Sequence, residues 1–127
     1  MKENYAVIDK NIESLVMILN QCGFMTYASC QGHGWPVDQL KPYIAFNTEI
    51  TKAAKFEKIL RDEMESASSR LNWGWEVEGT FNCEYELCFS LRMCSYTRWY
   101  CRYFRSSINR DFDTIECMLS AHFKMLP

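Results

Sequence analysis

Residues 27–36 (YASCQGHGWP) hold a thiol, an imidazole, an amide and two glycines within ten positions. Cys30 could act as a nucleophile if its pKa were lowered, and His33 stands close enough in sequence to be the base that lowers it. Gln31 could donate a hydrogen bond to a developing oxyanion. One chemistry that this stretch predicts is therefore covalent catalysis through Cys30.

Two glycines give the same stretch a second chemistry. Gly32 and Gly34 can adopt backbone angles that are closed to other residues, and they let a ligand approach main-chain amides closely. Amides exposed in such a loop bind phosphate or carboxylate groups. The residues expected to contact this anion are Ser29, Cys30, Gln31, Gly32, His33 and Gly34. Anion binding is the preferred interpretation over catalysis. In the plain alternative, without function, Cys30 ends a strand, Gly32 and Gly34 form a tight turn, and His33 is exposed.

A metal site would need further ligands from elsewhere in the chain. Cys30 and His33 could bind a metal only if the fold brought Cys22 or His122 beside them. The seven cysteines contain no C-x-x-C pair, which is the spacing that zinc sites use. No metal and no cofactor are therefore expected, and the cysteines are interpreted as free thiols in a reducing cytoplasm.

A second segment, residues 94–105, interleaves arginines with aromatic residues. Arginines bind phosphates and aromatic rings stack on bases, and both residue types are enriched at the hot spots of protein interfaces. The expected phosphate contacts are Arg98, Arg102 and Arg105. The expected partner contacts are Tyr96, Trp99, Tyr100 and Tyr103. In the plain alternative the aromatics fill the core and the arginines pair with the glutamates of residues 76–86.

Hydrophobic periodicity predicts the elements that must position these two segments. Apolar residues recur at three- and four-residue steps over residues 10–22, which predicts a helix with Asp9 as N-cap and Gly23 as its stop. Period-two alternation predicts an antiparallel hairpin with a turn around residues 79–82. The expected strands are 24–30, 43–47, 73–78 and 84–93, with a small edge strand around Tyr5 and Val7.

Two further helices complete the order α-β-β-α-β-β-α. The second helix is expected to have Thr51 as its N-cap and an apolar face that runs on to Leu71. Ser106 or Ser107 is expected to cap the last helix. The predicted fold class is α+β: a two-layer sandwich with a four-stranded, mainly antiparallel sheet and the helices on one face.

Composition limits the class of protein. A chain of 127 residues with 48% hydrophobic residues predicts one folded domain over residues 1–127. The longest apolar run is far shorter than the ~20 residues of a membrane helix, and no secretory signal follows the first basic residue. A cytoplasmic protein with no membrane partner is therefore expected. The net charge of -2 removes a global electrostatic argument for nucleic acid but leaves room for local basic patches.

Residues 29–33 (SCQGH) resemble loops in two groups of proteins. An S-C-x-G-R loop after a strand occurs in the small wybutosine-synthesis methyltransferases that modify transfer RNA, and His33 stands where those proteins have arginine. An S-C-Q-G-H loop followed by a strand similar to residues 43–46 (YIAF) occurs in uncharacterised phage and bacterial proteins. The resemblance covers roughly residues 23–47, and it implies a phage or prophage setting.

Three classes of function follow from these residues. The leading hypothesis is a small cytoplasmic binding module, not an enzyme, that recognises a phosphate-bearing ligand (a nucleotide or RNA) through residues 29–34. The second is a phage-type effector that inhibits a host protein by surface contacts, as an anti-defence protein would. The third is a nucleotide- or RNA-modifying enzyme that depends on Cys30. A second copy of the chain, in a homodimer, is a further partner to consider.

Overall fold

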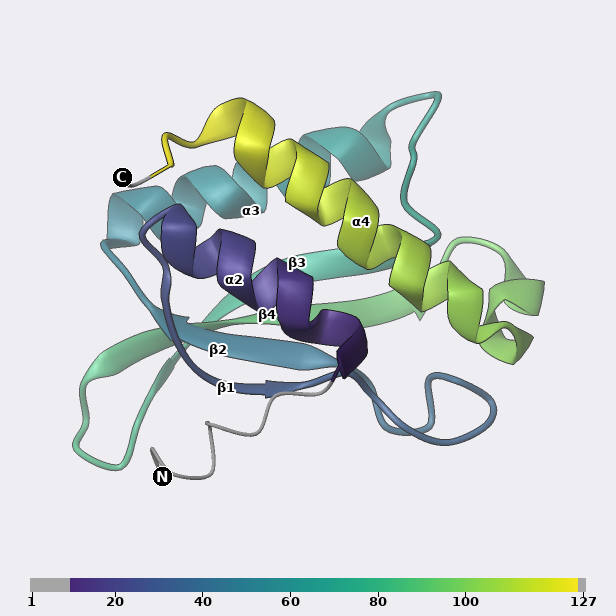
Figure 1. Cartoon of the computed structure of the whole chain (residues 1–127), viewed down its shortest axis with the longest axis horizontal. Helices are drawn as coiled ribbons and strands as arrows, with labels where there is room; N and C mark the ends of the chain where they lie inside the picture. Colours follow the sequence, from purple (N-terminus) through teal and green to yellow (C-terminus); the bar gives the residue numbers. More distant parts are fainter. Residues whose placement is uncertain (1–9, 126–127) are drawn as a thin grey trace.

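The computed structural model describes residues 10–125, and the expected N-cap Asp9 and edge strand at Tyr5 and Val7 lie outside that range. Within residues 10–125, three α-helices cover one face of a four-stranded antiparallel sheet (Figure 1). In chain order the elements are η1 (Lys10–Ile12), α2 (Glu13–Gln21), β1 (Met25–Cys30), β2 (Tyr43–Asn47), α3 (Ile50–Glu65), β3 (Trp73–Phe81), β4 (Leu87–Tyr96), η2 (Trp99–Tyr103) and α4 (Arg105–His122). The predicted α+β sandwich and its element order are confirmed. None of the described helices has the length and apolar character needed to cross a membrane.

Strand register separates the two faces of the sheet. The strand order is β1-β2-β4-β3, and every neighbouring pair is antiparallel. Directly opposed residues share a face. Ile44 is opposite Leu91 on the face that packs against the helices, whereas Tyr43 is opposite Arg92 on the other face. Large apolar side chains therefore gather between sheet and helices, and polar ones gather on the open face.

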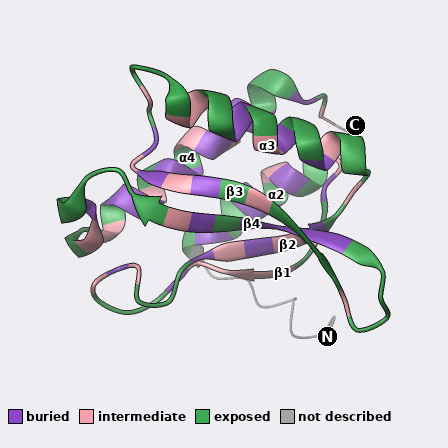
Figure 2. Ribbon diagram, turned by 180° about the vertical axis from the view of Figure 1, so that it is seen from behind, coloured by how far each residue is buried: buried purple, intermediate pink, exposed green. Residues whose placement is uncertain are grey.

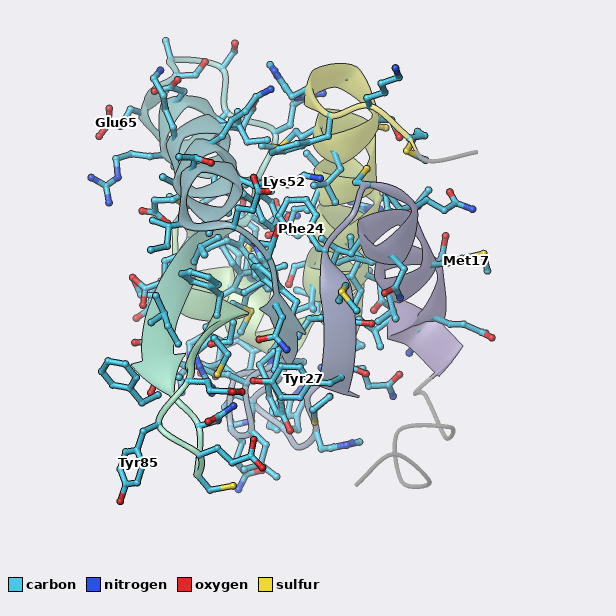
Figure 3. All side chains as sticks on the ribbon, turned by 90° about the vertical axis from the view of Figure 1, so that its left-hand side faces the viewer. Met17, Phe24, Tyr27, Lys52, Glu65 and Tyr85 are labelled. Carbon is cyan, nitrogen blue, oxygen red and sulfur yellow. The ribbon has the colours of Figure 1, made fainter. Side chains whose placement is uncertain are left out.

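The core is rich in aromatic rings. Phe24 is fully buried, with its ring centroid 5.2 Å from that of Phe46 and 5.3 Å from that of Phe56. Trp73 and Trp75 of β3 are fully buried beneath α4. Burying one such side chain contributes about 1.5–3 kcal/mol. Figure 2 shows the buried residues between the layers, and Figure 3 shows Lys52 of α3 close to Phe24 at the edge of this core.

The helix ends differ from the predicted ones. Helix α3 begins at Ile50 rather than after Thr51, and it ends at Glu65. The buried Leu71 therefore belongs to the loop that follows α3. That loop contains several serines, and its backbone amides bond to serine hydroxyls and to the Glu63 carboxylate. Such local side-chain bonds compete with helix formation, which explains the early end.

The turn of the β3–β4 hairpin was predicted too early. Strand β3 continues to Phe81, and the turn occupies residues 82–86. The Asn82 side-chain oxygen accepts hydrogen bonds from the amides of Glu84 at 2.9 Å and Glu86 at 3.0 Å. An asparagine whose side chain bonds to the backbone two residues ahead is a strong turn former, so the turn begins at Asn82 and not at the predicted Gly79.

Ser107 does not cap α4, and neither does Ser106. The helix begins at Arg105, with Phe104 at the N-cap position and no side-chain hydrogen bond there. The Ser107 hydroxyl is buried and donates back to the carbonyls of Cys101 and Phe104 at 3.0 and 2.8 Å. By contrast, Gly23 has the expected left-handed conformation, with a φ of 91° after α2.

Candidate functional site

The loop of residues 31–42 joins β1 to β2 and has a defined conformation. Gly32 and Gly34 have φ values of 86° and 98°, so the predicted need for glycine is confirmed. A Cβ on Gly32 would lie 2.8 Å from the carbonyl oxygen of Leu40. His33 and Leu40 exchange two backbone hydrogen bonds of 2.9 and 3.0 Å, which close the loop upon itself.

Arg105, the first residue of α4, holds this loop in place. Its guanidinium donates hydrogen bonds to the carbonyl oxygens of Gln31 and, at 2.6 Å, Gly32. The arginine segment thus folds beside the loop, but Arg105 is directed at loop carbonyls. A guanidinium that binds two carbonyls positions the backbone, and this is the role that the contacts assign to Arg105.

The loop and η2 lie at the same end of the molecule (Figure 1), and further contacts join them into one unit. The amide of Val37 donates to the carbonyl of Arg102 at 2.7 Å. The Arg102 guanidinium pairs with Asp38 at 3.2 Å, and this hydrogen bond raises the pKa of Arg102. The ring of Trp35 lies 5.2 Å from that of Tyr103. Arg102 therefore has a partner within the loop and not among the glutamates of residues 76–86, contrary to the plain alternative.

The aromatic residues of this unit form an exposed surface, which we call the aromatic platform. Its members are Trp35, Trp99, Tyr100, Tyr103 and Phe104, and all are exposed. Trp35 and Trp99 are both 67% exposed. The Trp99 ring lies 5.9 Å from Tyr100 and 6.2 Å from Tyr103, so the rings support one another. The alternative in which these aromatics fill the core is therefore wrong, and a gathered apolar surface of this kind marks an interaction site.

Tyr96, the remaining expected partner contact, belongs to the end of β4. Its ring lies 6.0 Å from the buried Trp73 and 5.9 Å from the Arg102 guanidinium. It is 40% exposed, so it borders the aromatic platform and also rests on the core.

Beside the platform, the start of α4 and η2 enclose a cavity of about 340 Å³, which we call the arginine pocket. Its lining includes Asn72, Arg98, Tyr100, Phe104, Ser106 and Arg110. Of the described residues that line it, none is acidic. Arg98 donates to the Asn72 side-chain oxygen at 2.7 Å, and within residues 10–125 no carboxylate lies within ion-pair distance of Arg110. The pocket is therefore a locally positive site.

Arg110 and Phe104 were not among the expected ligand contacts. Arg110 lies on the second turn of α4, beyond the segment that the sequence singled out. The first turn of α4 has no acidic residue, although acids are favoured where the helix dipole is positive. That missing acid next to several arginines is the pattern that could have pointed to the pocket.

A buried carboxylate, also not anticipated, supports the pocket from behind. Asp111 is fully buried and accepts hydrogen bonds from the amides of Asn72 (2.8 Å) and Trp73 (2.9 Å) and from the Trp75 indole (2.8 Å). Burial raises the pKa of Asp111 to about 6, although these hydrogen bonds oppose the shift. The Asn72 amide group also donates to the Ser107 carbonyl at 3.1 Å. Asp111 thus fixes Asn72, the residue that orients Arg98.

Cys30 and His33 do not line the arginine pocket. Cys30 ends β1 opposite Tyr43, which places its side chain on the open face of the sheet, and its sulfur accepts from the Gly32 amide at 3.4 Å. His33 is exposed at the bridge to Leu40. No group of three or more metal-binding side chains occurs among the described residues. Cys22 is buried near the carbonyl of Leu119, so the structure does not bring it to Cys30.

One end of the molecule therefore collects the loop, the aromatic platform and the arginine pocket. No protein-family model matches this chain, and no curated protein or solved structure is significantly similar to it. The resemblance of residues 23–47 to the S-C-x-G-R and S-C-Q-G-H loops stays a prediction.

Proposed function

We propose that this protein is a binding module for a phosphate-bearing ligand with unpaired bases, a nucleotide or a single-stranded RNA. The observation that carries the proposal is the junction of the aromatic platform with the arginine pocket. Tyr100 and Phe104 belong to both, so a base and a phosphate of one ligand can be held side by side.

Stacking supplies one part of the binding free energy. Trp99 and Trp35 expose large flat rings, and contacts with Tyr103 hold both of them. Stacking of a base on an aromatic side chain contributes about 1–3 kcal/mol and tolerates any base. The platform therefore favours unpaired bases over a duplex, whose bases are already stacked.

Cations supply the other part. Arg102 is paired with Asp38 and Arg105 with loop carbonyls, which leaves Arg98 and Arg110 as the pocket's phosphate ligands. In this proposal the loop of residues 29–34 acts as a scaffold that places Trp35, in addition to any anion contact of its own. Binding through arginines releases counterions, so affinity should fall as salt rises.

The proposal is tested by fluorescence anisotropy with labelled single-stranded RNA and the matching duplex at two salt concentrations. We expect the single strand to bind more tightly than the duplex and more weakly at high salt. Trp99→Ala should weaken binding about tenfold, whereas Tyr85→Ala, at the other end of the sheet, should not. Absence of binding at low salt would remove the proposal.

A second candidate is a protein partner, such as the host protein of a phage-type effector. Tryptophan, tyrosine and arginine gathered on one exposed surface also favour a protein interface. Under this candidate the Trp99→Ala variant loses a stoichiometric complex isolated from a bacterial lysate, and RNA does not compete for it. Light scattering of the purified protein would distinguish a homodimer from either case.

The Cys30-dependent enzyme remains the third hypothesis. The Cys30 sulfur accepts a hydrogen bond from the Gly32 amide at 3.4 Å. Alkylation by iodoacetamide at neutral pH, read residue by residue with mass spectrometry, tests it. Reaction of Cys30 no faster than the exposed Cys83 and Cys117 would argue against a catalytic thiol.

A further inference from the structure

The arginine pocket differs from the aromatic platform in shape and in charge. The platform is an exposed surface, on which successive bases can stack. The pocket is a concavity of about 340 Å³ with Tyr100 and Phe104 in its lining and with Arg98 and Arg110 as its cations. A concavity of this size can receive a group at the end of a ligand.

The two guanidinium groups match a doubly charged anion. The Arg98 side chain uses Nη2 to bond to Asn72 at 2.7 Å, which fixes its position and leaves its other N–H groups as donors. Arg110 is exposed and close enough to line the same cavity. An internal phosphodiester carries one negative charge, whereas a phosphomonoester carries about -1.5 to -2 near pH 7 and has three acceptor oxygens.

The start of α4 adds to this preference. The helix is 18 residues long, has no side-chain cap and has no acidic residue in its first turn. Ser106, in that first turn, contributes to the lining. An anion in the pocket would therefore meet a hydroxyl and the positive end of a helix as well as the two arginines.

The buried carboxylate behind the pocket interacts electrostatically with Arg98, but among residues 10–125 it forms no ion pair with Arg98 or Arg110. Both oxygens of Asp111 accept hydrogen bonds from the start of β3, at 2.8 Å from Asn72 and 2.9 Å from Trp73. Asp111 is not among the residues that line the cavity. It supports the floor and leaves the arginines to face the ligand.

We propose that the arginine pocket receives a terminal phosphomonoester, so that the ligand is the phosphorylated end of a single strand or a nucleoside monophosphate. This inference rests on the proposed function and names the part of the ligand that is recognised. Arg98 and Arg110 bind the phosphate, and the platform stacks the adjoining base.

The test compares one RNA sequence with a 5′-phosphate, a 3′-phosphate or hydroxyls at both ends, by competition in fluorescence anisotropy. We expect either the 5′-phosphorylated strand or the 3′-phosphorylated strand to bind about tenfold more tightly than the strand with hydroxyls at both ends. Arg110→Gln should weaken binding of the phosphorylated strand more than binding of the hydroxyl strand, so that the difference between them falls to less than about twofold. Lys124→Gln is the matched control, because it removes the same charge beyond the far end of α4.

Each other outcome has a distinct meaning. Equal affinity for all three strands would overturn the inference and leave the proposed function standing. An equal loss for all three strands in Arg110→Gln would also overturn it, because the arginine would then contact internal phosphodiesters. Failure of every strand to bind would remove the proposed function and this inference together. Adenosine monophosphate, added as a competitor, separates the two sources: displacement at the affinity of the strand identifies a free nucleotide, and weaker displacement identifies a strand end.

Discussion

Both ends of the sheet expose aromatic side chains, but the two ends are built differently. At the hairpin turn of residues 82–86, Tyr85 is 85% exposed and Phe81 is 68% exposed. Figure 3 shows Tyr85 extending from the turn away from the body of the protein. At the other end of the molecule, Trp35 lies in the loop that Arg105 holds, and its ring and those of Trp99, Tyr100 and Tyr103 in η2 contact one another.

The charges of the two ends are also opposite. The hairpin turn carries Glu84 and Glu86, whereas the platform adjoins Arg98 and Arg110. Exposed rings alone therefore do not distinguish a site, since both ends have them. The distinguishing features are rings held by tertiary contacts and two arginines, Arg98 and Arg110, that form no ion pair among the described residues.

The largest expected effect comes from removing the buried support of the platform end. Asp111→Ala would leave the amides of Asn72 and Trp73 and the Trp75 indole without an acceptor in a buried site. Each stranded donor costs about 1–3 kcal/mol, so for the three donors we expect a loss of at least about 3 kcal/mol in the free energy of unfolding. Chemical denaturation measures it. The control Asn82→Ala, which removes the turn-forming side chain at the hairpin, should cost about 1 kcal/mol; equal losses would contradict the difference between the ends.

Asp111 should also make stability depend on pH. Its pKa rises from 3.8 to about 6 on folding because of burial. A raised carboxyl pKa means that the folded state binds the proton more tightly, so this contribution is complete below pH 4 and is lost as the pH rises through 6. The difference between 3.8 and about 6 corresponds to at most roughly 3 kcal/mol. Denaturation curves from pH 4 to 7 give the free energy of unfolding of the wild-type protein and of Asp111→Ala, and the difference in their pH dependence is the contribution of Asp111. If the free energy of unfolding changed with pH equally in both proteins, the effect would belong to other groups.

Loss of the contact between Arg105 and the loop should lower the free energy of unfolding by less than loss of Asp111, and its effect on amide exchange should be confined to the loop. Arg105→Gln removes a charged donor from the carbonyls of Gln31 and Gly32, which should cost about 1.5–3 kcal/mol and speed amide exchange in the loop. Hydrogen exchange with mass spectrometry reports both. Arg92→Gln breaks an exposed pair with Glu78 on the open face of the sheet and should cost less than about 1 kcal/mol. Unchanged exchange in residues 31–42 would show that other contacts hold the loop.

The fold was predictable because it depends on burial, which leaves a periodic pattern in the sequence. The α+β order and the glycine loop could be derived from spacing and residue type. Errors occurred where local side-chain bonds decide, as at Asn82 and Ser107. Periodicity carries no information about such bonds.

The site was less predictable because its contacts join distant parts of the chain. Arg105 lies 73 residues from Gly32, and Asp111 lies 38 residues from Trp73. In the sequence Asp111 is one of several charged residues on a helix, and nothing distinguishes it from its solvated neighbours. Arg110 likewise gains its interest only from the pocket that the fold forms around it.

The smallest expected effect separates charge from ring placement. The double variant Glu84→Lys and Glu86→Lys would give the hairpin turn cations beside the exposed Tyr85 and Phe81. These rings are outside any ring contact found among the described residues, so we expect little stacking there. Single-stranded RNA affinity should rise less than about threefold, or roughly 0.7 kcal/mol, and only at low salt. Anisotropy in a Trp99→Ala background isolates the new end, because the platform is then weakened. A tenfold gain in affinity at the hairpin turn would mean that positive charge beside any exposed ring is sufficient for RNA binding. The contacts that hold the platform rings would then not be needed for binding.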